Sequence, residues 1–172
     1  MATDVTARLQ VKLDVTEKST SLGSALKTSS LQHLINYVKV TVNGTTDASH
    51  QQDLVYSEQN TATASANTLD VAASLTSKLT GAAVTMVEVT AICVVNKSTT
   101  SGEVLIIGAG SNPLLNWVNA TGDAVKVGAS GVFLITSPLN GYAVTATTGD
   151  ILTIDPGAAT ISYDIILLGR SA

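Results

Sequence analysis

The sequence cannot form a disulfide bond within the chain, because Cys93 is its only cysteine. An internal disulfide and a cysteine-rich metal site are therefore excluded, and we expect Cys93 to be a small buried apolar residue. The length of 172 residues fits one domain, or one domain with an extension. A hydrophobic fraction of 45% is sufficient for such a chain to bury a packed core.

Charge is also scarce: 13% of the residues are charged, whereas about 25% is typical of soluble domains. The net charge is −4, and no cluster of Lys and Arg offers the positive surface that grips phosphates, so we expect no nucleic-acid partner. No apolar run approaches the ~20 residues that span a bilayer, and the amino terminus lacks a basic segment followed by an apolar one. We therefore expect synthesis in a cytoplasm and no membrane partner.

Hydroxyl side chains take the place of the missing charges. The chain contains 24 Thr and 17 Ser, and β-branched Thr suits the exposed face of a strand. Apolar residues alternate strictly with polar ones from Val5 to Val15, which predicts a half-buried strand. Residues 17–30 read as a loop, and the spacing from Leu31 to Val38 allows one or two helical turns. A further strand is expected to end at Asn43-Gly44, a strong turn signal.

Residues 45–68 are small and polar, and 60–67 have the composition of an exposed connector. We therefore divide the chain into a strand, loop and arm region at 1–67 and a β-sandwich core at 68–172. Within the core, short apolar runs are separated by turns that contain glycine. They predict strands near 69–76, 84–96, 103–109, 132–136, 142–147, 151–154 and 161–168. This spacing favours an all-β, antiparallel, jelly-roll-like sandwich with an N-terminal arm.

Motifs that could carry chemistry are weak. An apolar strand runs into Gly108-Ala109-Gly110, but Pro113 occupies the third glycine position of a dinucleotide loop, so we expect a turn there. His33 and His50 have no partner at metal-ligand spacing. Asp150 and Asp155 bracket one short strand, about 16 Å apart if extended, which favours turn capping over a catalytic pair or a calcium loop. We therefore expect no catalytic residue, cofactor site or metal site, and no enzyme activity.

Trp117 is the most conspicuous aromatic residue, followed later in the chain by Phe133 and Tyr142. A carbohydrate-binding module would need an exposed aromatic platform, and aromatics form only 3% of the chain. We therefore expect Trp117 to pack in the core or between subunits.

The order of several stretches after residue 68 resembles a family of small tailed-bacteriophage virion proteins. The resemblance covers about 60% of the chain and rests on Leu69–Thr76, Gly131–Ile135, Gly141–Val144, Gly149–Leu152 and Tyr163–Gly169. It implies a structural role in the virion, in the head or in the tail. Residues 1–67 carry no such resemblance.

Together these features predict a capsid decoration, or cement, protein that stabilises the assembled phage head through protein contacts. Its partners would be the major capsid protein and copies of itself, with a trimer implied by the resemblance. The arm strand could pair within its own chain or add to a neighbour's sheet. The residues expected to serve assembly are Val5, Leu9, Val11, Leu13 and Trp117. A tail or fibre component and a carbohydrate-binding sandwich are the alternatives.

Overall fold

Antiparallel β-sheets make up the regular structure of the chain. The computed structural model describes residues 5–20, 28–46, 49–78, 80–108 and 110–172, with side chains at all of these except 13–20 and 28–40. Every secondary-structure element over these residues is a strand. The expected all-β class is thereby confirmed.

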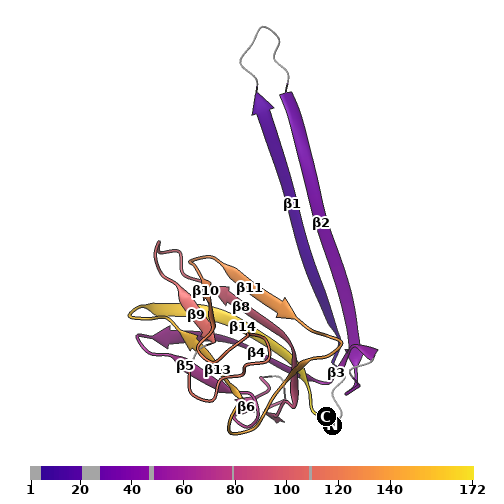
Figure 1. The fold of residues 1–172 in the computed structure, drawn as a ribbon, viewed down its shortest axis with the longest axis vertical. Helices are drawn as coiled ribbons and strands as arrows, with labels where there is room; N and C mark the ends of the chain where they lie inside the picture. The colour runs from indigo at the N-terminus through magenta and orange to yellow at the C-terminus, as the bar shows by residue number, and fades with distance from the viewer. Residues whose placement is uncertain (1–4, 21–27, 47–48, 79, 109) are drawn as a thin grey trace. The chain divides into compact units, whose positions relative to one another are not determined.

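The larger sheet, which we call sheet C, has the strand order β11-β8-β14-β4, and the short strand β12 also pairs with β8 (Figure 1). Its strands are β4 (Leu54–Thr63), β8 (Glu88–Asn96), β11 (Val132–Thr136), β12 (Tyr142–Ala143) and β14 (Thr160–Arg170). Strand β14 lies between β4 and β8 and pairs along most of its length with both. The carboxyl-terminal strand therefore organises this sheet.

The smaller sheet, sheet D, has the strand order β10-β9-β13-β5. Its strands are β5 (Asn67–Asp70), β9 (Leu105–Gly108), β10 (Ala124–Val127) and β13 (Ile151–Asp155). A separate two-stranded sheet pairs β6 (Leu75–Thr76) with β7 (Ala83–Val84). The run expected at 69–76 is thus divided between β5 and β6, the run at 84–96 between β7 and β8, and only the first two residues of 142–147 form a strand, β12.

Both sheets contribute to one hydrophobic core. Ile92 and Ile165 of sheet C and Ile107 and Leu152 of sheet D belong to the same buried cluster. Burying such side chains contributes about 1.5–3 kcal/mol each relative to leaving them exposed. The shared core is consistent with the expected jelly-roll-like sandwich.

The chain separates into two compact units, one formed by Thr6–Thr41 and the other by Met1–Val5 with Val42–Ala172. The first is a hairpin of β1 (Ala7–Thr20) and β2 (Thr28–Asn43), paired antiparallel over their full facing lengths. The last two residues of β2 pair in parallel with β3 (Gln51–Gln52). The second unit thus begins well before the boundary expected at residue 67.

Three local expectations were wrong. Residues 17–20 and 28–30, expected in a loop, belong to β1 and β2, which pair with each other there. The range 31–38 is part of β2 rather than a helix, because pairing with β1 satisfies its backbone over the whole length. Residues 60–63, expected in an exposed connector, belong to the edge strand β4 (Leu54–Thr63), whose polar residues face outward while Tyr56 and Ala62 are buried. A polar edge strand carries little hydrophobic signal in the sequence.

Candidate assembly surface

The two candidate carboxylates cap turns. Asp150 is buried and its Oδ2 accepts a hydrogen bond from the backbone N–H of Thr147 at 2.5 Å. Asp155 Oδ1 accepts one from the backbone N–H of Gly157 at 2.8 Å. Both contacts tie a carboxylate to its own turn, as the sequence analysis favoured. Neither carboxylate is held in a cluster of three or more His, Cys, Asp or Glu, since the described residues contain none.

The remaining sequence motifs are also accounted for locally. Gly108 ends β9 with φ of 122°, and a Cβ there would lie 2.7 Å from the carbonyl oxygen of Asp123. The close approach of two backbone segments explains the glycine, and no helix follows it in the described part of the chain. His50 lies in a turn with φ of 55°. The side chain of His33 lies outside the described residues.

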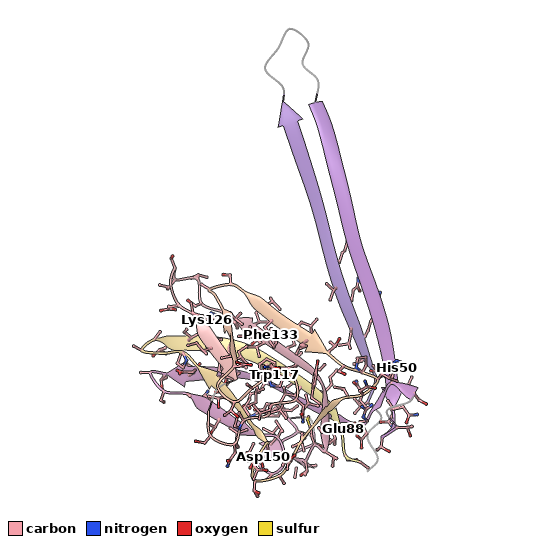
Figure 2. All side chains as sticks on the ribbon, in the orientation of Figure 1. His50, Glu88, Trp117, Lys126, Phe133 and Asp150 are labelled. Atoms are coloured by element: carbon pink, nitrogen blue, oxygen red, sulfur yellow. The ribbon has the colours of Figure 1, made fainter. Side chains whose placement is uncertain are left out.

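Trp117 is a core residue of the single chain. It is 8% exposed and its ring lies 5.6 Å from that of Phe133, with the planes tilted by 52° (Figure 2). The indole N–H is buried without a hydrogen-bond partner in the structure. Of the two locations expected for Trp117, the core is the one found. The other aromatic side chains that the structure describes are buried or half-buried, so none of them forms an exposed platform.

The candidate arm residues lie at the amino-terminal side of the hairpin. Val5 and Leu9 are half-buried, and Val11 is 45% exposed. The side chain of Leu13 lies outside the described residues. Strand β1 pairs with β2 of the same chain, so its main-chain hydrogen bonds along that edge are already made. The arm is therefore a ribbon of two paired strands rather than a lone strand.

The opposite face of sheet C from the core carries apolar side chains. The register places Leu134, Cys93 and Ile166 side by side in one row across three strands, and Val132 and Val95 in the next. Val132 is 64% exposed and Ile166 is 42% exposed. We call this surface the outer patch and define it by Val55, Cys93, Val95, Val132, Leu134 and Ile166.

The charge on these two rows is limited to Asp164, which lies beside Val95 in the register and is paired with Lys97 at 3.3 Å. Cys93 is half-buried on this face rather than buried as expected, and the partial burial raises the pKa of its thiol. Sequence reasoning did not find the outer patch. Its members come from four strands, and their adjacency depends on the register between strands far apart in the chain.

A shallow hollow of about 470 Å³ borders the outer patch along β4 and β14. Glu58 on its wall forms an ion pair with Lys78 at 2.7 Å and accepts a hydrogen bond from the hydroxyl of Tyr56. The hydrogen bonds from Lys78 and Tyr56 lower the pKa of Glu58. Burial, together with the Glu58 carboxylate, raises the pKa of Tyr56. The hollow is open. Glu58 and Lys78 on its wall pair with each other, and Asp164 pairs with Lys97 outside it.

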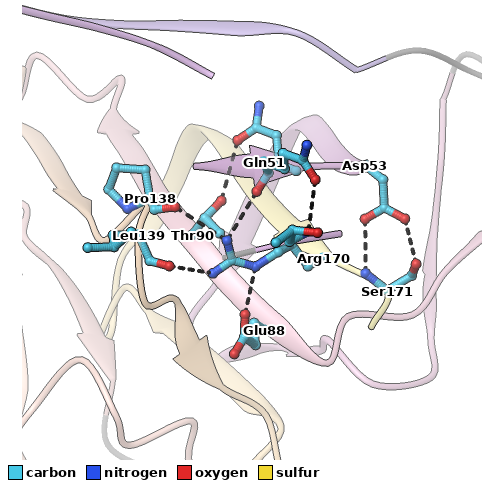
Figure 3. Close-up of polar contacts among 10 residues, drawn as sticks. Gln51, Asp53, Glu88, Thr90, Pro138, Leu139, Arg170 and Ser171 are labelled. Atoms are coloured by element: carbon cyan, nitrogen blue, oxygen red, sulfur yellow. Dashed lines mark hydrogen bonds and ion pairs between the residues drawn. The ribbon is translucent and has the colours of Figure 1, made fainter. Parts of the chain in front are cut away.

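Arg170, near the carboxyl terminus, is fully buried and holds several segments together (Figure 3). Its Nε donates to Glu88 Oε2 at 2.6 Å, and its Nη1 donates to the carbonyl oxygens of Gln51 at 3.2 Å and Pro138 at 3.3 Å. Nη2 donates to the carbonyl oxygen of Leu139 at 3.4 Å. One guanidinium therefore links β3, β8, β14 and the segment between β11 and β12.

The backbone at Gly141 approaches Arg170 and Glu88 closely. Gly141 has φ of 67°, and a Cβ there would lie 2.9 Å from both Arg170 Nη2 and Glu88 Oε2. The next residue, Ser171, donates its backbone N–H to Asp53 Oδ1 at 2.9 Å and its hydroxyl to Oδ2 at 2.5 Å. This cluster fixes the carboxyl terminus and has the features of a structural clamp rather than a reactive site.

Comparison with protein-family models, curated proteins and solved structures found no match to this chain. Within the described residues, the structure has no helix long and apolar enough to cross a membrane.

Proposed function

We propose that the chain is a phage capsid decoration protein, which binds the assembled head and stabilises it through protein contacts. The observation that carries this proposal is the outer patch, where Val132 and Ile166 remain exposed on the outer face of a well-packed sheet. Exposed apolar surfaces of this kind mark interaction sites. The resemblance of the region after residue 68 to phage virion proteins supports a phage particle as the place of this interaction.

The proposed role is binding without turnover. The carboxylates that the sequence singled out cap turns, and Arg170 and Glu88 satisfy each other in a structural cluster. The proposed partners are the major capsid protein and further copies of the chain, with a trimer favoured, and the proposed location is the virion capsid. No nucleic acid, membrane, cofactor or metal takes part in this proposal.

The test is add-back to phage heads that were assembled without this protein. Purified chain is mixed with such heads and, separately, with tails from the same phage, and binding is measured by cosedimentation. We expect saturable binding to the heads and a higher temperature of head disruption. Saturable binding to tails alone would overturn the proposal and support the tail alternative. Binding to neither, with affinity for glycans instead, would support the carbohydrate-binding alternative.

A further inference from the structure

We infer that strand β4 (Leu54–Thr63) of one molecule pairs antiparallel with β4 of a second copy of the chain, about a twofold axis at Ser57. The pairing goes beyond the proposed function, because it joins two copies in solution and is tested without a phage head. A twofold contact also differs from the trimer favoured above, and one assembly can contain both.

The backbone of β4 is hydrogen-bonded along one side only. Its register places Thr63 opposite Thr160 of β14. Just beyond the strand, the N–H of Ala64 donates to the carbonyl oxygen of Ala159 at 2.8 Å. Successive residues of an antiparallel strand point their N–H and C=O groups to opposite sides. Even-numbered residues of β4 therefore bond to β14, and odd-numbered residues direct their backbone groups away from the sheet.

Side chains of the same chain close only one end of this free edge. The N–H of Thr61 donates to Asn60 Oδ1 at 2.8 Å, and its carbonyl oxygen accepts from Asn67 Nδ2 at 3.2 Å. Within the described part of the chain, no hydrogen bond is made by the backbone groups of the outward-directed residues before it, Val55, Ser57 and Gln59. All three side chains are exposed, and the open hollow borders two of them.

Strand β4 also lacks the features that keep edge strands from pairing. It has ten residues, whereas β5, β10 and β11 at the other edges of sheets C and D have four, four and five. It contains no proline, lysine or arginine, and its register with β14 has no bulge. Its only charged residue, Glu58, is paired with Lys78 at 2.7 Å. Edge strands that stay unpaired are usually short or carry proline, lysine or a bulge, so β4 has the character of a strand that gains a partner.

The spacing of the free groups favours a second copy as that partner. An antiparallel copy centred on Ser57 places Ser57 opposite Ser57, and Val55 opposite Gln59 of the other copy. Every free N–H and C=O group of these residues then meets a free group of the second copy. Moving the axis by one residue places Gln59 opposite Asp53, or Val55 opposite Thr61, and both of these have their N–H groups already bonded.

Charge favours the same axis. With the axis at Ser57, Glu58 of one copy lies opposite Tyr56 of the other, so a carboxylate meets a hydroxyl-bearing ring. With the axis at Glu58, two carboxylates would lie directly opposite each other, which destabilises a strand pair. The register that satisfies the backbone is therefore also the one that separates the two carboxylates.

The contact is small, and so we expect it to be reversible. Residues 54–60 pair in this register and extend about 23 Å, and a sheet edge about 10 Å thick then buries about 230 Å² on each copy. Interfaces below about 1,200 Å² in total belong to weak or transient complexes. We therefore expect an equilibrium between monomer and dimer that depends on protein concentration.

Disulfide trapping tests the register. Two matched variants, Ser57→Cys and Gln59→Cys, are made in a Cys93→Ser background, and each is gently oxidised. Across the axis the two Cα atoms of position 57 lie about 5.5 Å apart, within disulfide range, whereas those of position 59 lie more than about 13 Å apart. We expect Ser57→Cys to form a disulfide dimer at least about tenfold faster than Gln59→Cys. A tagged Val55→Cys chain mixed with an untagged Gln59→Cys chain, in the same background, should give the mixed dimer.

Sedimentation velocity over a range of concentrations measures the pairing without a cross-link. Ser57→Pro removes the N–H at the axis, and proline is tolerated on an edge strand where the N–H faces solvent. The matched control Ser57→Thr keeps this N–H. We expect the wild-type chain and Ser57→Thr to dimerise as concentration rises, and Ser57→Pro to remain a monomer with unchanged Trp117 fluorescence. If Ser57→Pro does not fold, the disulfide comparison decides.

Three results would overturn the inference. Equal rates of disulfide formation in Ser57→Cys and Gln59→Cys would mean that copies collide without this register. A wild-type oligomer that folded Ser57→Pro leaves unchanged would mean that copies meet at another surface. A wild-type monomer at all concentrations, with no Ser57→Cys dimer, would mean that no second copy occupies the edge. Protection of the Ser57→Cys thiol from alkylation in that monomer would assign the edge to another segment of the same chain.

Discussion

Replacing Arg170 with Met tests whether the buried clamp at the carboxyl terminus holds the fold. The substitution keeps an unbranched apolar chain but removes four hydrogen bonds, to Glu88 and to the carbonyl oxygens of Gln51, Pro138 and Leu139. Removing one partner of a buried ion pair costs about 3–5 kcal/mol. The Glu88 side chain is 25% exposed and can regain some hydration, so we expect about 3 kcal/mol.

The assay is urea unfolding followed by the fluorescence of Trp117, the only tryptophan and a buried one. Protein concentration is held fixed, because self-association changes apparent stability. A loss of about 3 kcal/mol corresponds to a fall in Tm of about 6–12 °C for a chain of this size. The matched control is Lys97→Met, which breaks an ion pair whose side chains are 40% and 42% exposed and should cost less than about 1 kcal/mol. If Arg170→Met were as mild as this control, the clamp would not hold the fold.

Three further predictions concern the pH response, the core and the association. Burial raises the pKa of Tyr56, Tyr142 and Tyr163, so the folded state keeps protons that the unfolded state loses, and the free energy of unfolding should fall as pH rises above about 10. In Tyr56→Phe the urea midpoint should fall less steeply with pH, and a fall as steep as in the wild-type chain would contradict the prediction. Trp117→Ala should cost about 3–5 kcal/mol in thermal unfolding because it empties a core position beside Phe133; a cost under about 1 kcal/mol would mean that the site is not core. Association between copies should slow as salt increases, because residues 6–41 carry a net charge of +3 and the rest of the chain carries −7. Association rates that do not change with salt in stopped-flow mixing would show that charge attraction does not speed the encounter.

The sequence predicted the strands whose apolar pattern is strong. It missed those that become strands only by pairing with another segment. The run from Val5 to Val15 lies almost entirely in β1, and the apolar runs of β9, β11, β13 and β14 are found where expected. In contrast, Leu31, Leu34, Ile35 and Val38 have helical spacing, yet pairing with β1 makes them part of a strand. Strand β10 was missed because its four residues include the charged Lys126 and give too short a pattern.

The candidate surfaces were even less accessible from sequence. Trp117 was singled out correctly as a packing residue, but Ile166 and Cys93 become neighbours only through the pairing of β14 with β8. The burial of Arg170 has no local signal, because an arginine two residues from the end of the chain reads as exposed. Both features depend on contacts between residues distant in sequence, which periodicity does not report.

The most direct test of the proposed function is to locate the chain on the virion. Cryo-electron microscopy of particles with and without the protein should give difference density on the outside of the head, at positions where neighbouring capsomers meet. The density should repeat with the lattice and accommodate more than one copy at each position. Difference density confined to the tail, or none on the particle, would contradict the assignment as a capsid decoration protein.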